Sequence, residues 1–337
     1  MASPKLLTVF GATGNQGGSV IDIVLSDESL KERYRLRGIS RNSSSKSAQA
    51  LTARGVEMVS ANVNDLESLK AAVRGSHGVF GVTNFWDKDV MSKKIEVQQG
   101  KNIFEACKAE SVKHYVFSSL PHVEVLTRGD LQHVDHFDGK AIVAEFAEAN
   151  KGDMLVSYFQ PGKLATALVY VQTGFANCAS AMYVKSYKDQ IRNIAGQAKL
   201  LMPFAEPSST DATWPVIDPR ADAGKYIVGL FEGGTRANGV KVQAVSTWTC
   251  SHDLLAAISR EAGKEVQFQA VTPEELEAAL PENVSREITE TMLLVGKYEY
   301  YGKGSVHDQA DSDAWLVKGS TVSSLKDVVA AGGPWRF

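Results

Sequence analysis

A glycine-rich turn lies near the start of the chain, between an apolar segment and a segment of helical character. The apolar segment is Leu6–Phe10, the turn runs from Gly11 to Gly18, and the helical segment runs from Ser19 to Leu25. Gly11 permits a tight turn, Gly14 lets the backbone approach a pyrophosphate, and Gly17 lets the helix pack close to the strand. The first N–H groups of such a helix face an anion. This order predicts a dinucleotide-binding site. The spacing is G-x-x-G-x-x-G, and a turn without a ligand is the alternative.

The chain then alternates short apolar segments with segments of helical length. The strands expected after the first are Leu36–Ser40, Val56–Ala61, Gly78–Thr83, Tyr115–Ser118 and Ala165–Gln172. The helices expected between them are Ser44–Arg54, Leu66–Arg74 and Lys93–Glu110. Such alternation produces right-handed βαβ crossovers. We therefore expect an α/β fold, a Rossmann doubly wound parallel sheet.

The alternation breaks down in the second half of the chain. We expect residues 1–177 to form the dinucleotide-binding Rossmann domain. Residues 178–337 are expected to form a smaller C-terminal α/β lobe for a substrate or partner. Part of 215–250, near Ala223–Phe231, is expected to pack back on the sheet.

Charge and cysteine usage exclude several classes of protein. The formal net charge is −3 and there is no basic run, which argues against binding to nucleic-acid phosphates. The three cysteines, Cys107, Cys178 and Cys250, are odd in number and widely separated, as is typical of a reducing compartment. We find neither the apolar core of a signal peptide nor an apolar run as long as a membrane span. The expected location is the cytoplasm, with the nucleus as the alternative. Nothing in the sequence indicates the oligomeric state.

The end of the second expected strand bears on the choice of cofactor. An acidic residue at this place, about 20 residues beyond the glycines, bonds the ribose of NAD, whereas an arginine accommodates the 2′-phosphate of NADP. Here the sequence is Ser40-Arg41-Asn42-Ser43, with Lys46 following and no carboxylate nearby. This predicts that NADP(H) is the cofactor; the alternative for Arg41 is a solvated loop residue.

Several short motifs together resemble one known family. They are Gly11–Gly18, Val82-Thr83-Asn84-Phe85-Trp86, Gln99-Gly100-Lys101, Phe117-Ser118-Ser119-Leu120 and His136-Phe137-Asp138-Gly139-Lys140. In these motifs the chain is similar to the NmrA-like group of atypical short-chain dehydrogenases/reductases, most closely over residues 1–180. That group includes fungal nitrogen regulators, an NADPH sensor and reductases. The resemblance implies a nicotinamide cofactor.

The resemblance also implies which residues line that cofactor. They are Gly11, Ala12, Thr13, Gly14, Asn15, Gln16, Gly17, Arg41, Asn62, Val63, Thr83, Asn84, Phe85, Lys140, Phe175, Ala176, Asn177 and Cys178. The family often has Gly-Asp after the third strand, where this chain has Ala61-Asn62, so an amide would face the adenine. Residues 150–163 resemble an insertion between the Lys140 helix and the sixth strand.

The candidate catalytic residues are His136 and Lys140. Ordinary short-chain dehydrogenases use Tyr-x-x-x-Lys on a helix, and here the same spacing holds a histidine and a lysine on one helical face. The lysine is expected to hold the nicotinamide ribose, with or without a catalytic role. The histidine is either a proton donor or a structural residue beside the cofactor, and a neighbouring ammonium disfavours its charged form.

Two other clusters of reactive side chains are not interpreted as sites. His133, Asp135, His136 and Asp138 lie close in sequence, but no second group of ligands matches them, so no metal is expected. Ser118 and Ser119 near His122 lack a nucleophile elbow and fit cofactor-facing hydroxyls equally well.

Two functions remain open. The first is an NADPH-dependent reductase of a small C=O or C=N compound, an imine or iminium, held under the second lobe. Its pocket would be lined by aromatic residues, for which core or surface packing is the alternative: Trp214, Tyr298, Tyr300 and Tyr301. The second is a regulatory protein that senses NADP(H), binds a partner protein and performs no chemistry.

Overall fold

The computed structural model describes residues 3–87, 90–162, 191–204 and 213–335. The strands of the N-terminal part of the chain form one large parallel sheet. Within these residues the sheet has seven strands in the order β10-β6-β5-β4-β1-β2-β3, and every pair of neighbours is parallel. The strands are β1 (Lys5–Val9), β2 (Tyr34–Ser40), β3 (Glu57–Ser60), β4 (Gly78–Gly81), β5 (His114–Ser118), β6 (Leu155–Pro161) and β10 (Lys241–Ala244). The strand order reverses between β1 and β4, as in a doubly wound Rossmann sheet. The expected fold class is confirmed.

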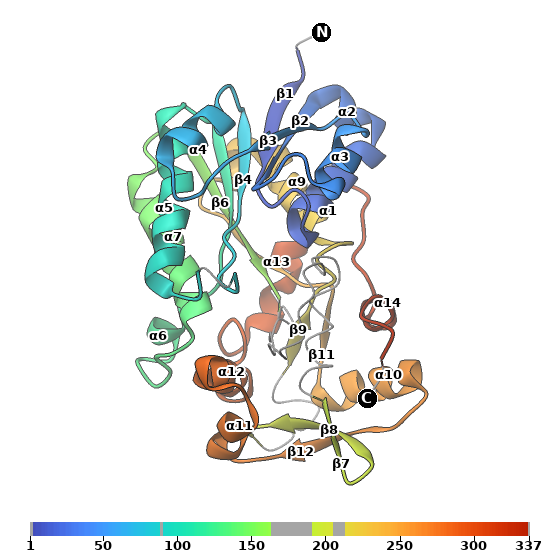
Figure 1. The fold of residues 1–337 in the computed structure, drawn as a ribbon. Coiled ribbons are helices and arrows are strands. Elements are labelled where there is room, and N and C mark those ends of the chain that lie inside the picture. Colours follow the sequence, from blue (N-terminus) through green and yellow to red (C-terminus); the bar gives the residue numbers. More distant parts are fainter. Residues whose placement is uncertain (1–2, 88–89, 163–190, 205–212, 336–337) are drawn as a thin grey trace.

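Helices cover both faces of this sheet (Figure 1). One face is covered by α1 (Asn15–Ser26), α2 (Glu28–Arg33), α3 (Lys46–Thr52) and α9 (Ala223–Gly233). The other is covered by α4 (Leu66–Val73), α5 (Lys93–Ala109) and α7 (Asp135–Asn150). The expected helices lie at these places, with ends displaced by a few residues. Helix α1 begins at Asn15, within the glycine-rich segment and four residues before the expected Ser19.

The sixth strand differs from our expectation. We interpreted residues 150–163 as an insertion and placed the strand at Ala165–Gln172, which lies outside the described residues. The interpretation as an insertion is wrong, because β6 lies within that range and pairs with both β5 and β10. Val156 and Tyr158 pack with the helices of one face and Phe159 packs on the other. Polar residues within this strand hid its buried character in the sequence: Ser157 is fully buried, bonded to His114 and the Ala237 carbonyl.

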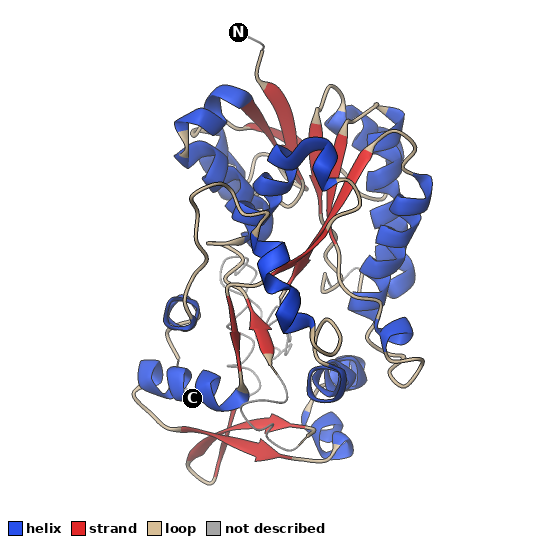
Figure 2. Ribbon diagram, turned by 180° about the vertical axis from the view of Figure 1, so that it is seen from behind, coloured by secondary structure: helices blue, strands red, loops and turns tan. Residues whose placement is uncertain are grey.

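Residues beyond β6 build two further sheets, a three-stranded one at the end of the molecule opposite the N-terminus and a two-stranded one between it and the large sheet (Figure 2). A three-stranded sheet has the order β12-β8-β7, and a two-stranded sheet pairs β11 with β9. Their strands are β7 (Ile191–Ile194), β8 (Gln197–Met202), β9 (Trp214–Val216), β11 (Thr247–Thr249) and β12 (Val266–Ala270). The remaining elements are α6 (Val123–Leu126), η1 (Gly234–Ala237), α10 (Ser251–Ala262), α11 (Pro273–Ala279), α12 (Glu282–Leu293), η2 (Leu294–Tyr298), η3 (Ser305–Asp308), α13 (Gln309–Asp313) and α14 (Leu325–Ala331).

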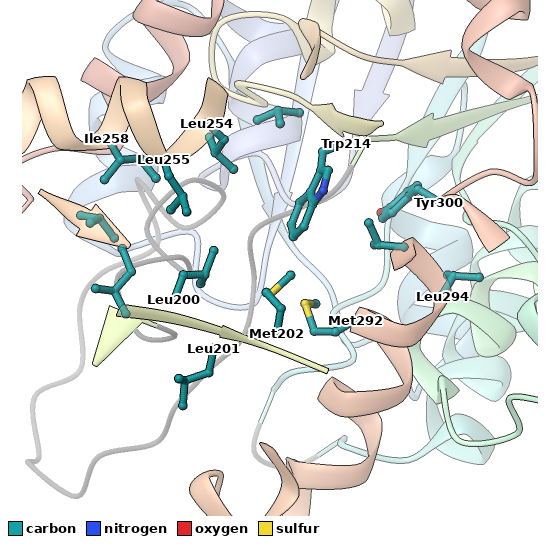
Figure 3. Packing of buried hydrophobic residues seen from close by; sticks show 14 of the residues in the cluster. Leu200, Leu201, Met202, Trp214, Leu254, Leu255, Ile258, Met292, Leu294 and Tyr300 are labelled. Carbon is teal, nitrogen blue, oxygen red and sulfur yellow. The ribbon is translucent and has the colours of Figure 1, made fainter. Parts of the chain in front are cut away.

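This part of the chain forms a core together with residues between Leu120 and Phe137, and it also returns to the large sheet. Its core surrounds the fully buried Trp214, which lies near Met202, Leu254 and Met292 (Figure 3). Within 215–250, β10 forms the edge of the large sheet, and α9 packs closely on α1, where a Cβ at Gly224 would lie 2.4 Å from the Ser19 carbonyl oxygen. Among the described helices, none is both long and apolar enough to cross a membrane.

Candidate functional site

The turn between β1 and α1 has the geometry of a phosphate cradle. Gly11 has a φ of +62°, in the left-handed region that favours glycine, and its carbonyl accepts from Gly14 N at 2.8 Å. A Cβ on Gly17 would lie 2.4 Å from the Gly11 carbonyl oxygen, so the helix approaches the turn as closely as a glycine allows. Gly14 is the N-cap of α1 and provides no side-chain hydrogen bond. The first N–H groups of α1 therefore fit an anionic ligand.

The residues expected around this turn meet at one edge of the sheet. Ala12 and Thr13 lie in the turn, and the side chains of Asn15 and Gln16 are buried in the first turn of α1. Because β4, β1 and β2 are parallel neighbours, residues that follow them share the carboxyl edge, where ligands bind in this fold. Thr83 and Arg41 are thereby placed beside the glycine turn.

Arg41 follows β2 and carries an exposed guanidinium. It pairs with Asp87 Oδ2 at 2.6 Å, and the Arg41 side chain is 82% exposed. Ser43 follows Arg41 by two residues, and Ser60 ends the neighbouring strand β3. Ser60 Oγ accepts a hydrogen bond from Ser43 N at 2.9 Å. The Asp87 side chain is 16% exposed, so the pair joins an exposed guanidinium to a half-buried carboxylate.

The loop after β3 holds Asn62 and Val63 and is tied to α5. Asn102 Nδ2 donates to the Val63 carbonyl at 3.0 Å, and Gln99 Nε2 donates to Asn64 Oδ1 at 3.1 Å. Asn62 Oδ1 accepts from Asn64 N at 3.0 Å, which closes the loop on itself. The amide of Asn62 therefore shapes its own loop.

A buried ion pair lies between the end of β4 and α7. Lys140 Nζ donates to Glu96 Oε1, and Thr83 Oγ1 donates to the same oxygen at 2.8 Å. Glu96 has no exposed surface and Lys140 is 7% exposed. A Cβ on Gly139 would lie 2.9 Å from Glu96 Oε2, so this glycine leaves room for the carboxylate. The expected residues Thr83 and Lys140 are thus joined through a carboxylate on α5.

His136 lies one helical turn before Lys140, among aromatic rings. Its ring centroid is 5.9 Å from Phe85 and 5.1 Å from Trp86. Its Nδ1 is hydrogen-bonded to Glu287 Oε1 on α12. Phe85 is buried and Asn84 is exposed in the same loop. The structure therefore brings together Thr83, Phe85, His136 and Lys140. The remaining expected residues, Phe175–Cys178, lie outside the described residues.

The acidic and histidine residues near His136 do not share one centre. His133 pairs with Glu290, Asp135 pairs with Lys93, and Asp138 Oδ1 accepts from Val123 N at 2.7 Å. Burial raises the pKa of the Asp138 carboxyl. A different group, His122, Glu124 and Asp138, has its potential ligand atoms within 4.8 Å of one another. Lys93 Nζ lies 4.0 Å from Asp138 Oδ2 and already supplies a positive charge there.

The serine and aromatic candidates have structural contacts. His122 Nδ1 bonds Glu145 at 2.7 Å, and Ser119 Oγ donates to the Leu120 carbonyl at 3.3 Å. Trp214 and Tyr300 belong to the buried core of the C-terminal part (Figure 3). The two remaining candidates bond elsewhere: Tyr298 to Asp130 at 2.7 Å and Tyr301 to the Gln160 carbonyl at 2.8 Å. These contacts agree with the alternative stated for the aromatic residues, that they pack in the core or on the surface.

Sequence reasoning missed both carboxylates of the site, Glu96 and Glu287. Glu96 had a usable signal, since it shares one helical stripe with the buried Gln99, Gly100 and Ile103. A carboxylate on a buried stripe implies a cationic partner. Glu287 lies 151 residues from His136, and we find no local pattern that links them.

Comparison with known proteins gives one consistent answer. A family model for the NmrA-like family matches residues 3–326. The NmrA-like family domain-containing oxidoreductase himF of Aspergillus japonicus is 28% identical over 319 residues, covering 89% of this chain and 86% of that protein. The crystal structure of NmrA, a negative transcriptional regulator, in complex with NAD has a TM-score of 0.73 at 18% identity, covering 98% and 95%. The NADPH-dependent quinone oxidoreductase QOR2 of Escherichia coli, complexed with NADPH, has a TM-score of 0.68 at 18% identity, covering 96% and 98%. Because the family model spans nearly the whole sequence, the chain belongs to the NmrA-like family.

Proposed function

We propose that this protein is an NADPH-dependent reductase of a small C=O or C=N compound. The observation that carries the proposal is the placement of His136 and Lys140 on one face of α7, beside the Thr83–Phe85 loop. A titratable imidazole and an ammonium at the carboxyl edge of a Rossmann sheet are the groups that a reduction by hydride and proton requires. The name oxidoreductase given to himF supports the same class.

The residues of the glycine turn would hold the cofactor. The uncapped start of α1 would face the pyrophosphate, Arg41 the 2′-phosphate, and Lys140 the nicotinamide ribose. QOR2, of the same fold, was crystallised with NADPH, and NmrA with NAD and with NADP. When bound, the reduced nicotinamide supplies a hydride to the substrate carbon. The chain itself must then supply a proton to the substrate oxygen or nitrogen.

Imines and iminium ions suit this site better than ketones. An iminium arrives already protonated, so it needs less help from a strong acid than a carbonyl does. The chain has histidine at the helical position where ordinary short-chain dehydrogenases have tyrosine. The replacement of tyrosine by histidine is consistent with a substrate that does not require a strong proton donor.

A regulatory protein that senses NADP(H) is the second candidate. It draws support from the likeness to NmrA, which is described as a negative transcriptional regulator. Such a protein would offer its partner an apolar surface of several hundred Å². Among the described residues, the exposed large hydrophobic side chains are Ile95 and Val125. We rank the reductase first because the similar protein himF is named an oxidoreductase.

The test is NADPH oxidation by the full chain against a panel of imines, ketones and quinones. Single-turnover oxidation of bound NADPH, followed by absorbance, separates chemistry from product release. Substrate-dependent oxidation, fastest with an imine, is the expected result. A panel that gives no oxidation above the rate without protein would overturn the reductase and favour the sensor.

A further inference from the structure

Helix α12 presents a carboxylate to the first turn of α7. Glu287 Oε2 accepts from Asp135 N at 3.0 Å, and Glu287 Oε1 accepts from His136 N at 3.0 Å. The N-cap of α7 is Val134, which provides no side-chain hydrogen bond. A residue from the C-terminal part of the chain therefore caps this helix.

The same carboxylate fixes the imidazole of His136. A carboxylate accepts hydrogen bonds only, so Nδ1 carries the proton that it shares with Glu287. The two side chains are 12% and 11% exposed. Within the described residues, Nε2 of His136 forms no hydrogen bond with the protein. A histidine with one nitrogen held by a carboxylate presents the other nitrogen for proton transfer.

The lysine one turn away has a carboxylate of its own. Glu96 pairs with Lys140, and Glu287 pairs with His136, so each of these two side chains contacts a separate carboxylate. Asp135, which precedes His136 on α7, is also paired, with Lys93.

We propose that Glu287 is the positioning residue for proton donation by His136, an inference that rests on the proposed function. In the step, the Nε2–H bond of the imidazolium breaks and an O–H or N–H bond forms on the substrate. The Nδ1–H stays donated to Glu287, and the neutral ring regains its Nε2 proton from water. The acid is assembled from two distant parts of the chain, because α7 carries the imidazole and α12 carries its carboxylate.

A second pair one turn away provides a matched control. Glu290 Oε1 contacts His133 Nδ1 at 2.7 Å, and Glu290 Oε2 accepts from His133 N at 2.7 Å. Arg286 also pairs with Glu290 at 3.4 Å, and the His133 side chain is 44% exposed. Both carboxylates join α12 to the chain at the start of α7, but only Glu287 bonds the histidine that lies one turn from Lys140.

The experiment compares Glu287→Gln, Glu287→Asp and Glu290→Gln in the full chain. Single-turnover NADPH oxidation should fall roughly 10- to 100-fold in Glu287→Gln, with NADPH affinity within about twofold of wild type. Glu287→Asp keeps the charge and should recover part of the rate. Glu290→Gln should lose stability to a similar extent but keep its rate. Equal rates in Glu287→Gln and Glu290→Gln would overturn the proposal while leaving the reductase intact.

A second readout does not depend on turnover. Nitrogen-15 NMR of labelled histidine, with the His136 signals identified by their loss in His136→Phe, reports which ring nitrogen carries a proton. Wild type should hold the proton on Nδ1, whereas Glu287→Gln should populate both neutral tautomers. An Nδ1 without a proton in wild type would overturn the proposal. If wild type oxidised no NADPH with any substrate, the proposed function and the positioning role of Glu287 would both fall.

Discussion

The ammonium of Lys140 and the carboxylate of Glu96 form an ion pair inside the protein, 44 residues apart in sequence. Glu96 Oε1 accepts from both Lys140 and Thr83, whereas Glu96 Oε2 is buried without a hydrogen bond among the described residues. A buried carboxylate with one unsatisfied oxygen depends strongly on its cation. The residue expected to hold the cofactor ribose therefore also stabilises the fold.

We expect loss of either partner to destabilise the protein. Lys140→Met leaves the Glu96 carboxylate buried without a cation, which costs about 3 to 5 kcal/mol of unfolding free energy. The double variant Glu96→Gln/Lys140→Met removes both charges and should be more stable than Lys140→Met alone. Urea unfolding of the two single variants and the double variant measures the coupling. Additive effects would contradict the pair.

Arg41 should select NADPH over NADH. A guanidinium on the 2′-phosphate is a charge-assisted contact, so Arg41→Ala should weaken NADPH binding roughly 10- to 100-fold and leave NADH binding unchanged. Asp87→Asn is the matched control, because it removes the charge of the half-buried partner of Arg41 without removing the guanidinium. That variant should bind NADPH as well as wild type or better. Calorimetric titration of both cofactors measures this, and an equal loss for NADH would refute the assignment.

Substitutions at Gly14 and Gly17, two of the four glycines of the turn, should have different effects. Gly14 has a φ of −92°, and its Cβ would lie 3.2 Å from the Gly11 carbonyl oxygen, so Gly14→Ala should fold. It should nevertheless bind NADPH weakly, because the new methyl group lies where the backbone approaches the phosphates. Gly17→Ala forces backbone atoms apart and should cost about 1 to 3 kcal/mol of stability as well. Wild-type NADPH affinity in Gly14→Ala would place the phosphate cradle elsewhere.

Local patterns in the sequence predicted the glycine turn and the alternation of strands and helices. Gly11 and Gly17 could be assigned because their roles depend on neighbours within a few residues. The strand at Leu155–Pro161 was missed because Ser157 and Gln160 interrupt its apolar character. Ser157 is tolerated in the core because His114 and the Ala237 carbonyl satisfy its hydroxyl.

The site itself depended on contacts that no local pattern encodes. The i, i+4 spacing placed His136 and Lys140 on one face of a helix, and they do share it. The carboxylates that pair with them come from α5 and α12, at positions fixed only by the packing of the whole chain. Glu96 was recognisable as a charge on a buried stripe, and Glu287 was not.

The buried His114 should make stability depend on pH. Burial, with a smaller effect from His77, lowers the pKa of His114 from 6.5 to about 4. The folded state thus binds a proton less readily than the unfolded state, so stability present above pH 6.5 is lost as the pH falls toward 4. This loss amounts to about 3 kcal/mol when complete. His114→Gln should lack it, whereas His307→Gln at an exposed position should keep it. Urea unfolding between pH 7 and 4 measures the difference, and parallel curves for wild type and His114→Gln would contradict it.

Replacing His136 by phenylalanine should separate the reductase from the sensor. Glu287 would still cap α7 through the N–H groups of residues 135 and 136, so its carboxylate keeps partners in His136→Phe. Under the reductase, kcat should fall on the order of 10² or more while NADPH affinity stays nearly constant, because only the proton donor is lost. His133→Phe is the matched control and should keep its kcat, since that histidine pairs with Glu290 at a more exposed position. Equal kcat in His136→Phe and wild type would remove the histidine from the mechanism. Under the sensor neither variant has an activity to lose, and the measurable change would be in how partner binding responds to NADPH.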